Sequence, residues 1–187
     1  MPPPPHASQF LLCLIVIPCA VYDYRWRLVP NWVTLPGVVL GIVLSFWTLG
    51  VWSSLEGLGL ALAIYGSLFL LRALGAGDVK LMAAVGAVVG PGPWLRIFLL
   101  TALCGGIAAL VLILVRGRFR HTLWNTGLIL ASITRGQAPH KLSPELDVRT
   151  TAGMRLPHAV MIACGTVLYL LLLETLGLRP GLASPVP

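Results

Sequence analysis

The sequence predicts an all-α integral membrane protein, a polytopic helical bundle with about six transmembrane helices. Hydrophobic residues make up 57% of the 187 residues, while Asp, Glu, Lys and Arg together make up 10%, against about 25% in soluble domains. The apolar residues gather into six runs, and the basic residues lie mainly in every second connection between them. Because six crossings of about 20 residues use most of the chain, we expect residues 1–187 to form a single membrane-embedded domain.

The six apolar runs predict the helices in order along the chain, at about 10–22, 32–52, 55–74, 79–90, 94–115 and 156–178. The fourth run would rise only about 18 Å as a helix, so we expect it to be tilted or half-buried and to continue into residues 91–93. Residues 1–7 are expected to form a disordered, proline-rich tail. The polar segment 116–155 is expected to be a cytoplasmic loop with room for a helix lying in the membrane surface.

The basic residues predict how this bundle is oriented. Eleven of the thirteen lysines and arginines fall on one side of a six-span topology, and only Arg96 and Arg179 fall on the other. Since basic loops stay in the cytoplasm, we expect both termini outside. Membrane lipid is an expected partner, with acidic headgroups near the basic loops. A nucleic-acid partner is not expected, because the basic residues form no continuous face.

The cysteines exclude several classes of site. Cys13, Cys19, Cys104 and Cys164 all lie in apolar runs, with no Cys-x-x-Cys pair and no histidine at ligand spacing. Neither a zinc site nor a disulfide framework is indicated, and the sequence implies no metal and no cofactor. The chain also lacks a His-Glu-x-x-His motif and a glycine-flanked serine with a histidine partner, which argues against zinc and serine proteases.

Two aspartates stand out, because a charged group at membrane depth costs about 2.5 to 3.5 kcal/mol. Asp23 ends the first run and Asp78 begins the fourth. The chain between them crosses the membrane out and back, so both carboxylates are expected at the cytoplasmic face, at similar depth. His158, at the start of the last run, is interpreted as a polar end residue or packing partner rather than a catalytic base.

Short motifs follow the first aspartate and precede the second. Pro30 restricts the residue before it to extended geometry, and Asn31 suits the N-cap of the next helix, so the pair favours a tight turn. Glycines at 75 and 77 would let a helix or an extended peptide approach the backbone; they could also simply end the third helix, and the two roles are compatible. The glycine pairs 37 with 41 and 86 with 90 are expected to serve helix packing.

These motifs resemble the two signatures of the type IV prepilin peptidases, which are membrane aspartyl proteases of the Gly-x-Gly-Asp class. The resemblance lies in Asp23-x-Arg25 with Val29-Pro30-Asn31, and in residues 75–81, Gly-Ala-Gly-Asp-Val-Lys-Leu. It extends from about residue 20 to 91, with a weaker echo at Leu156-Pro157 and Gly165. The resemblance implies that Asp23 and Asp78 are catalytic and that Gly75, Gly77, Lys80, Arg25, Pro30 and Asn31 shape the site or bind substrate.

The resemblance also implies a substrate and a location. The expected reaction is cleavage of the basic leader from pilin-like precursors at the cytoplasmic face of the bacterial inner membrane. Larger members of the family carry paired Cys-x-x-Cys motifs and also methylate the new N-terminus; this chain has no such motifs, so no N-methyltransferase activity is expected. The chain thus resembles the short, peptidase-only branch associated with Flp or tight-adherence pili. His158 stands where relatives often have an aromatic residue.

Two neighbouring carboxylates can activate water for peptide hydrolysis. Close together they cannot both ionise, so they share a proton near neutral pH. The ionised member takes a proton from water as the water attacks the scissile carbonyl, and the protonated member donates to the developing oxyanion. Asp78, near the positive end of its helix, is expected to be the ionised member, and Asp23, near the negative end of its own, the protonated one.

Two other functions remain open from the sequence. In a small transporter or proton-relay protein the acids would bind a cation or proton, which predicts ion-dependent flux and no precursor cleavage. In a non-enzymatic subunit of a pilus or secretion assembly, substitution of the aspartates would leave precursor processing unchanged.

Overall fold

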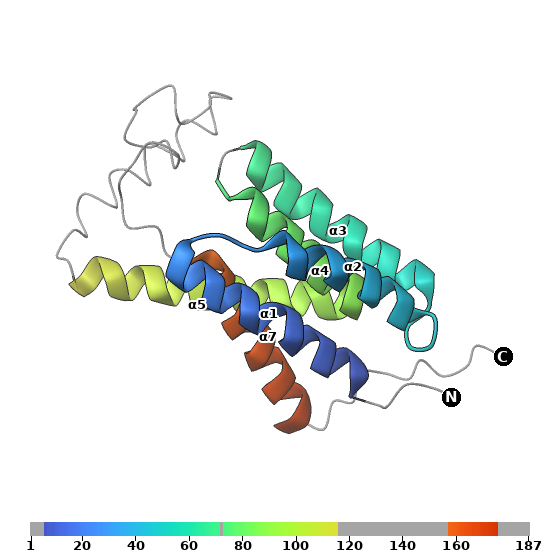
Figure 1. Ribbon diagram of the computed structural model, residues 1–187. Coiled ribbons are helices and arrows are strands. Elements are labelled where there is room, and N and C mark those ends of the chain that lie inside the picture. The colour runs from blue at the N-terminus through green and yellow to red at the C-terminus, as the bar shows by residue number, and fades with distance from the viewer. Residues whose placement is uncertain (1–5, 72, 116–156, 176–187) are drawn as a thin grey trace, which may run out of the picture.

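The computed structural model describes residues 6–71, 73–115 and 157–175. This part of the chain is helical and contains no strand. Its helices are α1 (Ala7–Trp26), α2 (Asn31–Ser45), α3 (Val51–Leu70), α4 (Ala76–Val89), α5 (Pro91–Val115) and α7 (His158–Thr175) (Figure 1). The predicted all-α class is confirmed, and one helix lies on each of the six apolar runs. The interfacial helix expected within 116–155 lies outside the described residues, as do residues 1–5 of the expected tail.

Helix boundaries differ from the expected ones at the turn between α2 and α3 and at the start of α1. The second run was expected to continue to residue 52, but α2 ends at Ser45 and α3 already begins at Val51. The N–H of Gly50 donates to the Ser45 carbonyl over 2.8 Å, with Gly50 at φ 84°. The turn is itself apolar and aromatic, so hydropathy did not mark it. Near the N-terminus, Ala7 was expected to belong to the disordered tail but is the first residue of α1.

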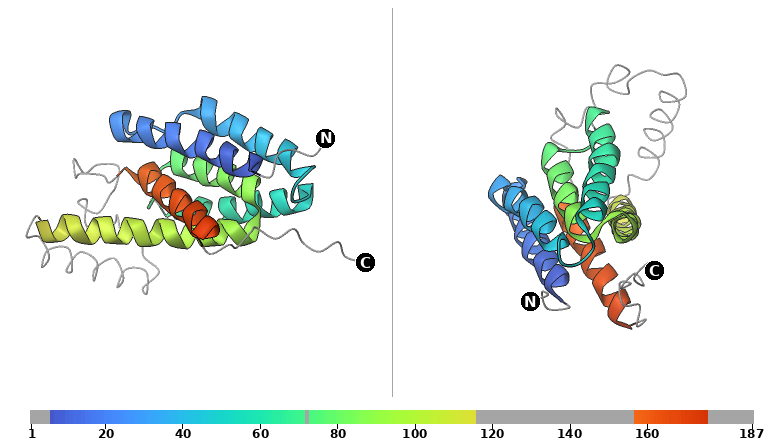
Figure 2. Two further views of the ribbon diagram at one scale, coloured as in Figure 1. Left: turned by 90° about the horizontal axis from the view of Figure 1, so that it is seen from below. Right: turned by 90° about the vertical axis from the view of Figure 1, so that its right-hand side faces the viewer.

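Helix α4 is short and enclosed by the rest of the bundle. Its last nine residues, from Leu81 to Val89, are all buried, and α1, α2, α3, α5 and α7 all contact it. Figure 2 shows α4 between the α1–α2 pair on one side and α3 and α5 on the other. A helix surrounded by protein is apolar all round and need not match the bilayer thickness, which explains the shortness of the fourth run.

The expected continuation of α4 into residues 91–93 is wrong. Gly90 takes φ 75° and ends the helix, and Pro91 then begins α5. A proline has no N–H to continue the hydrogen-bond ladder and suits the first turn of a new helix. The chain therefore turns at Gly90.

Glycines let the helices around α4 approach closely. A Cβ at Gly86 would collide with the Gly57 carbonyl of α3, and a Cβ at Gly41 would come within 2.9 Å of the Val88 side chain. Ser54 adds a hydrogen bond from its hydroxyl to the Ala87 carbonyl over 2.6 Å. The expected packing role of Gly37, Gly41 and Gly86 is confirmed.

The outer surface of the bundle carries many large apolar side chains. Leu14, Val39 and Leu103 are each more than half exposed. Four helices, α1, α3, α5 and α7, are long and apolar enough to cross a membrane, and α2 is a shorter apolar helix. Large apolar surfaces are unfavourable in water but are solvated by lipid tails. Together with these apolar helices, the surface shows that the protein is a multi-pass membrane protein.

Candidate active site

Asp23 lies near the end of α1, and its partner comes from the far end of the sequence. The side chain is 8% exposed. Its Oδ2 accepts a hydrogen bond from the Ala159 N–H over 2.9 Å, across 136 positions of sequence. Ala159 belongs to the first turn of α7, where N–H groups have no partner within their own helix and the helix dipole is positive. The first turn of α7 therefore binds the Asp23 carboxylate.

Asp78 is bound in a similar way, but locally. It is the third residue of α4, and its Oδ2 accepts a hydrogen bond from the Gly75 N–H at the helix start over 3.3 Å. This is half of a capping box, because Gly75 has no side chain to make the reciprocal bond. The expectation that Asp78 sits at the positive end of its helix is confirmed. Asp23 was expected near the negative end of α1, and the structure also places it at the positive end of α7.

The two carboxylates belong to one electrostatic group. The charges of Asp23 and Asp78 interact with each other, and each interacts with the imidazole of His158. The Asp78 charge also interacts with the Tyr65 hydroxyl on α3. Four helices, α1, α3, α4 and α7, thus bring ionisable side chains to one end of the bundle.

Sequence reasoning missed Tyr65 and gave His158 no part in the site. The two rings lie with their centroids 6.1 Å apart. The one available signal was that His158 follows Leu156-Pro157 at the start of a helix, and nothing in the sequence placed that helix start beside Asp23.

Gly77 accommodates the turn between α1 and α2. A Cβ at Gly77 would lie 2.8 Å from the Cβ of Val29, whereas one at Gly75 would meet only Asp78 Oδ2, at 3.4 Å. Of the two expectations for these glycines, approach by a neighbouring segment is therefore correct for Gly77. The contact holds the turn that follows Asp23 against the first turn of α4, which carries Asp78.

Lys80 and Asn31 also join these two segments. The Lys80 ammonium donates to the Asn31 Oδ1 over 3.0 Å, at the exposed surface. The expectation that Asn31 is the N-cap of α2 is wrong: Pro30 occupies that position, with φ −74° and ψ 127°, and no side chain caps the helix. The Asn31 amide is used instead to bind Lys80, which stands 49 positions later.

Arg25 is not brought to the carboxylates. Its side chain is exposed, and its guanidinium lies 5.4 Å from the ring centroid of Trp26. Arg27 is the arginine whose charge interacts with Asp23. Arg27 ends α1 in the left-handed conformation, with its N–H bound to the Asp23 carbonyl over 2.9 Å. This left-handed turn was not visible in the sequence, because arginine rarely adopts it.

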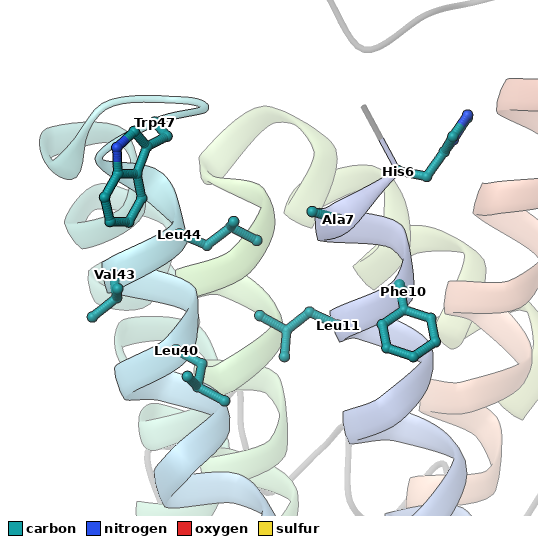
Figure 3. Close-up of a pocket in the computed structure, with 8 residues that line it drawn as sticks. All are labelled: His6, Ala7, Phe10, Leu11, Leu40, Val43, Leu44 and Trp47. Carbon is teal, nitrogen blue, oxygen red and sulfur yellow. The ribbon is translucent and has the colours of Figure 1, made fainter. Parts of the chain in front are cut away.

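A hollow on the protein surface lies elsewhere. A groove of about 420 Å³ lies between α1 and α2, and Figure 3 shows the side chains that line it. Its lining is almost wholly apolar and includes Phe10, Leu40 and Trp47, and it begins at His6 and Ala7, at the opposite end of α1 from Asp23. His6 is the one ionisable side chain in the lining, and neither aspartate reaches this groove. Within residues 6–71, 73–115 and 157–175, no three His, Cys, Asp or Glu side chains are gathered as metal ligands would be.

Comparisons with known proteins place the chain in a family. The model of the type IV leader peptidase family matches residues 10–110. The chain is 35% identical over 111 residues to the prepilin leader peptidase/N-methyltransferase of Escherichia coli K12, covering 54% of this chain and 48% of that protein. It is 31% identical over 125 residues to the protein of the same name from Burkholderia pseudomallei strain 1026b, covering 60% of this chain and 39% of that protein.

The chain therefore spans less than half the length of these curated relatives. No solved structure matches it. The family match includes Asp23, Asp78 and the glycines before Asp78, and it ends before α7. The protein, whose matched residues form more than half of its length and carry both aspartates, belongs to the type IV leader peptidase family.

Proposed function

We propose that the protein is a membrane aspartyl endopeptidase that removes the basic leader from prepilin-like precursors at the cytoplasmic face of the inner membrane. The observation that carries the proposal is that Asp23 and Asp78 lie at the same end of the bundle, near enough for their charges to interact. Each carboxylate also accepts one backbone hydrogen bond at a helix start. Family membership supports the same activity, since the relatives it matches are named as prepilin leader peptidases.

In the proposed reaction the two carboxylates hold one proton between them. The ionised carboxylate takes a proton from a water molecule, whose oxygen bonds to the scissile carbonyl carbon, and the protonated carboxylate donates to the carbonyl oxygen. Collapse of this intermediate breaks the C–N bond and returns a proton to the amine. Each carboxylate accepts a hydrogen bond from the start of a helix, Asp23 from α7 and Asp78 from α4. The helix dipole therefore no longer favours Asp78 over Asp23 as the ionised member. We treat the proton as shared by the pair.

The charged surface around the site supports the proposed orientation. Arg25, Arg27 and Lys80 are exposed at the end of the bundle that holds the aspartates. Basic residues favour the cytoplasmic side and acidic lipid headgroups. We therefore propose that the aspartates face the cytoplasm and both termini face outside. The basic side chains would bind lipid rather than the precursor's leader, whose charge has the same sign.

We also propose that the protein cleaves without methylating the product, as in the branch associated with Flp or tight-adherence pili. The support is the sequence itself, which has no Cys-x-x-Cys pair. Incubation with precursor and S-adenosylmethionine should give a product with an unmodified N-terminus by mass spectrometry. Addition of a methyl group by the purified protein would overturn this part.

The test of the main proposal is incubation of the purified protein in detergent with candidate precursors, followed by N-terminal sequencing of the product. A single cut at the end of the leader is expected. Asp23→Asn and Asp78→Asn should leave the precursor intact, and Glu56→Gln, which removes an exposed acid in α3, should cleave normally. Ion flux in liposomes without cleavage would instead support a transporter. Normal cleavage by both aspartate variants would refute the two-carboxylate mechanism.

A further inference from the structure

His158 is the residue of this site that peptidase motifs do not explain. It is the first residue of α7, directly before Ala159, whose N–H binds Asp23. The hydrogen bond that holds α7 against the end of α1 therefore also determines where the imidazole lies. Its charge interacts with that of Asp23 on α1 and with that of Asp78 on α4.

The His158 ring also lies beside aromatic side chains. Its centroid lies 6.1 Å from that of Tyr65, with the planes at 46°. Tyr65 is 2% exposed and is held edge-on by Trp94 and Phe98, with centroids 6.3 and 6.0 Å away. Trp94 is fully buried and anchored by a hydrogen bond from its indole N–H to the Met82 carbonyl over 3.1 Å. The imidazole thus lies against a cluster of buried and partly buried aromatic rings.

One nitrogen of the ring remains available. His158 Nε2 is shielded from solvent and has no hydrogen-bond partner within the described part of the chain. A buried polar atom without a partner costs free energy, so its presence calls for an explanation. A positive charge on this ring would lie beside two acids, Asp23 and Asp78.

Net charge shows why a histidine is useful at this place. Two carboxylates that share one proton carry a single negative charge, and an isolated charge shielded from water is costly. A protonated imidazole within electrostatic range of both would bring the group to neutrality. The other titratable or charged side chains on the helices around it are Cys13, Cys19, Tyr22, Tyr24 and Arg25 on α1, with Arg27 directly after it, Glu56 and Tyr65 on α3, Lys80 on α4, Arg96 and Cys104 on α5, and Cys164, Tyr169 and Glu174 on α7 itself. Of these, Arg27 is exposed and Arg96 acts on Tyr169, about three turns further along α7.

We propose that His158 is a positioning residue for the aspartate pair: its imidazolium, held beside the Tyr65 ring and at the start of α7, stabilises the singly protonated pair that activates the attacking water. This inference rests on the proposed peptidase function. It assigns to α7 a part in the reaction beyond the hydrogen bond to Asp23. The role is electrostatic and acts through the two carboxylates, so the imidazole itself need not touch the substrate.

The test compares pH profiles of cleavage for the full-length protein in detergent micelles. His158→Phe keeps a ring on Tyr65 and removes the charge, while His158→Gln keeps a polar group and removes the charge. His6→Phe is the matched control, because the His6 ring lies at the opposite end of α1 from Asp23 and is hydrogen-bonded to the nearby Gln9. All variants are first checked for a monodisperse peak and an unchanged thermal midpoint, and the kcat and KM values of each are then measured between about pH 5 and 8.

The expected result is a pH-dependent ratio of rates. For both His158 variants, kcat should be on the order of tenfold below wild type at the acidic end of the range, and the ratio should approach one at the alkaline end. KM should not change, and His6→Phe should follow wild type throughout. These outcomes would separate a charge effect from loss of packing, since lost packing would lower the rate equally at every pH.

Three outcomes would overturn the inference. If wild type cleaves and the His158→Phe ratio is constant with pH, the imidazole charge has no role, although the peptidase function stands. If both His158 variants fail the folding checks while His6→Phe passes, His158 is a structural residue. If wild type cleaves no precursor under any condition, the proposed function fails, and the inference fails with it.

Discussion

The two aspartates differ in where their support comes from. The start of α4 binds Asp78 through Gly75, three residues away, so this half of the site is built within one short segment. The end of α1 presents Asp23 to the start of α7, so the other half needs a helix 136 positions later. Both arrangements place a carboxylate against a free N–H at a helix start. The comparison shows that one chemical solution can be reached by a local motif and by a tertiary contact.

The largest expected effect comes from removing each aspartate, which tests whether Asp23 and Asp78 contribute equally to the reaction. Asp23→Asn and Asp78→Asn should each lower kcat by about 10³-fold or more, because either one removes the shared proton acceptor. The double variant should be no worse than either single variant, since the two act as one unit. Cleavage assays at saturating precursor measure this. A surviving rate near wild type in only one of the variants would show that one aspartate suffices.

The second prediction breaks the contact between the two halves. Gly77→Ala places a Cβ 2.8 Å from the Val29 Cβ, which pushes the α1–α2 turn away from α4 and should lower kcat by about 10². The added Val29→Ala change should restore much of the rate by making room. Gly75→Ala is the matched control and should retain most of the activity, because its Cβ meets only an ordinary contact at 3.4 Å. Equal losses in both glycine variants would contradict this account.

The third prediction removes each backbone donor in turn. Proline has no N–H and is tolerated in the first turn of a helix, so Ala159→Pro removes the donor to Asp23, and Gly75→Pro the donor to Asp78. A hydrogen bond to a charged group contributes about 1.5 to 3 kcal/mol, so each change should lower kcat by about tenfold or more. The loss should be larger for Ala159→Pro, whose bond is shorter, at 2.9 Å against 3.3 Å. A larger loss for Gly75→Pro would mean that the local half matters more.

The smallest expected effect concerns the clasp, the exposed Lys80–Asn31 hydrogen bond that joins the Asp23 and Asp78 halves of the site. Lys80 and Asn31 join the two segments by one exposed hydrogen bond, and exposed polar pairs contribute about 1 kcal/mol or less. Lys80→Met and Asn31→Ala should each lower the thermal midpoint in detergent slightly and change kcat by about twofold at most. A double-mutant cycle should give a coupling energy of about 0.5 kcal/mol. Coupling near zero would show that the clasp contributes nothing to stability.

Hydropathy and glycine spacing predicted much of the fold. One helix forms on each expected run, and Gly41 and Gly86 pack against neighbouring helices as expected. The errors lie where chain direction changes without a polar signal. The turn between Ser45 and Val51 is apolar, and the break at Gly90 depends on a positive φ that composition does not reveal.

The candidate site was predicted as far as its motifs are local. Asp23, Asp78 and the glycines before Asp78 are marked by their neighbours in sequence. Arg25 and Arg27 are two positions apart on an exposed helix end, and only the structure shows that Arg27, and not Arg25, acts on Asp23. Asn31 fits a cap position by type, but its actual partner, Lys80, lies 49 positions away.

By itself the sequence determined that the protein resides in a membrane and where its helices form, because burial in lipid depends on the apolar composition of each run. It also determined the binding of Asp78, since a helix start carries its own free N–H groups. Only the tertiary structure decided that the start of α7 would meet Asp23 and bring His158 and Tyr65 to the carboxylates. Those contacts depend on how closely the helices can pack around α4, and that packing is a property of all the helices together rather than of any one segment.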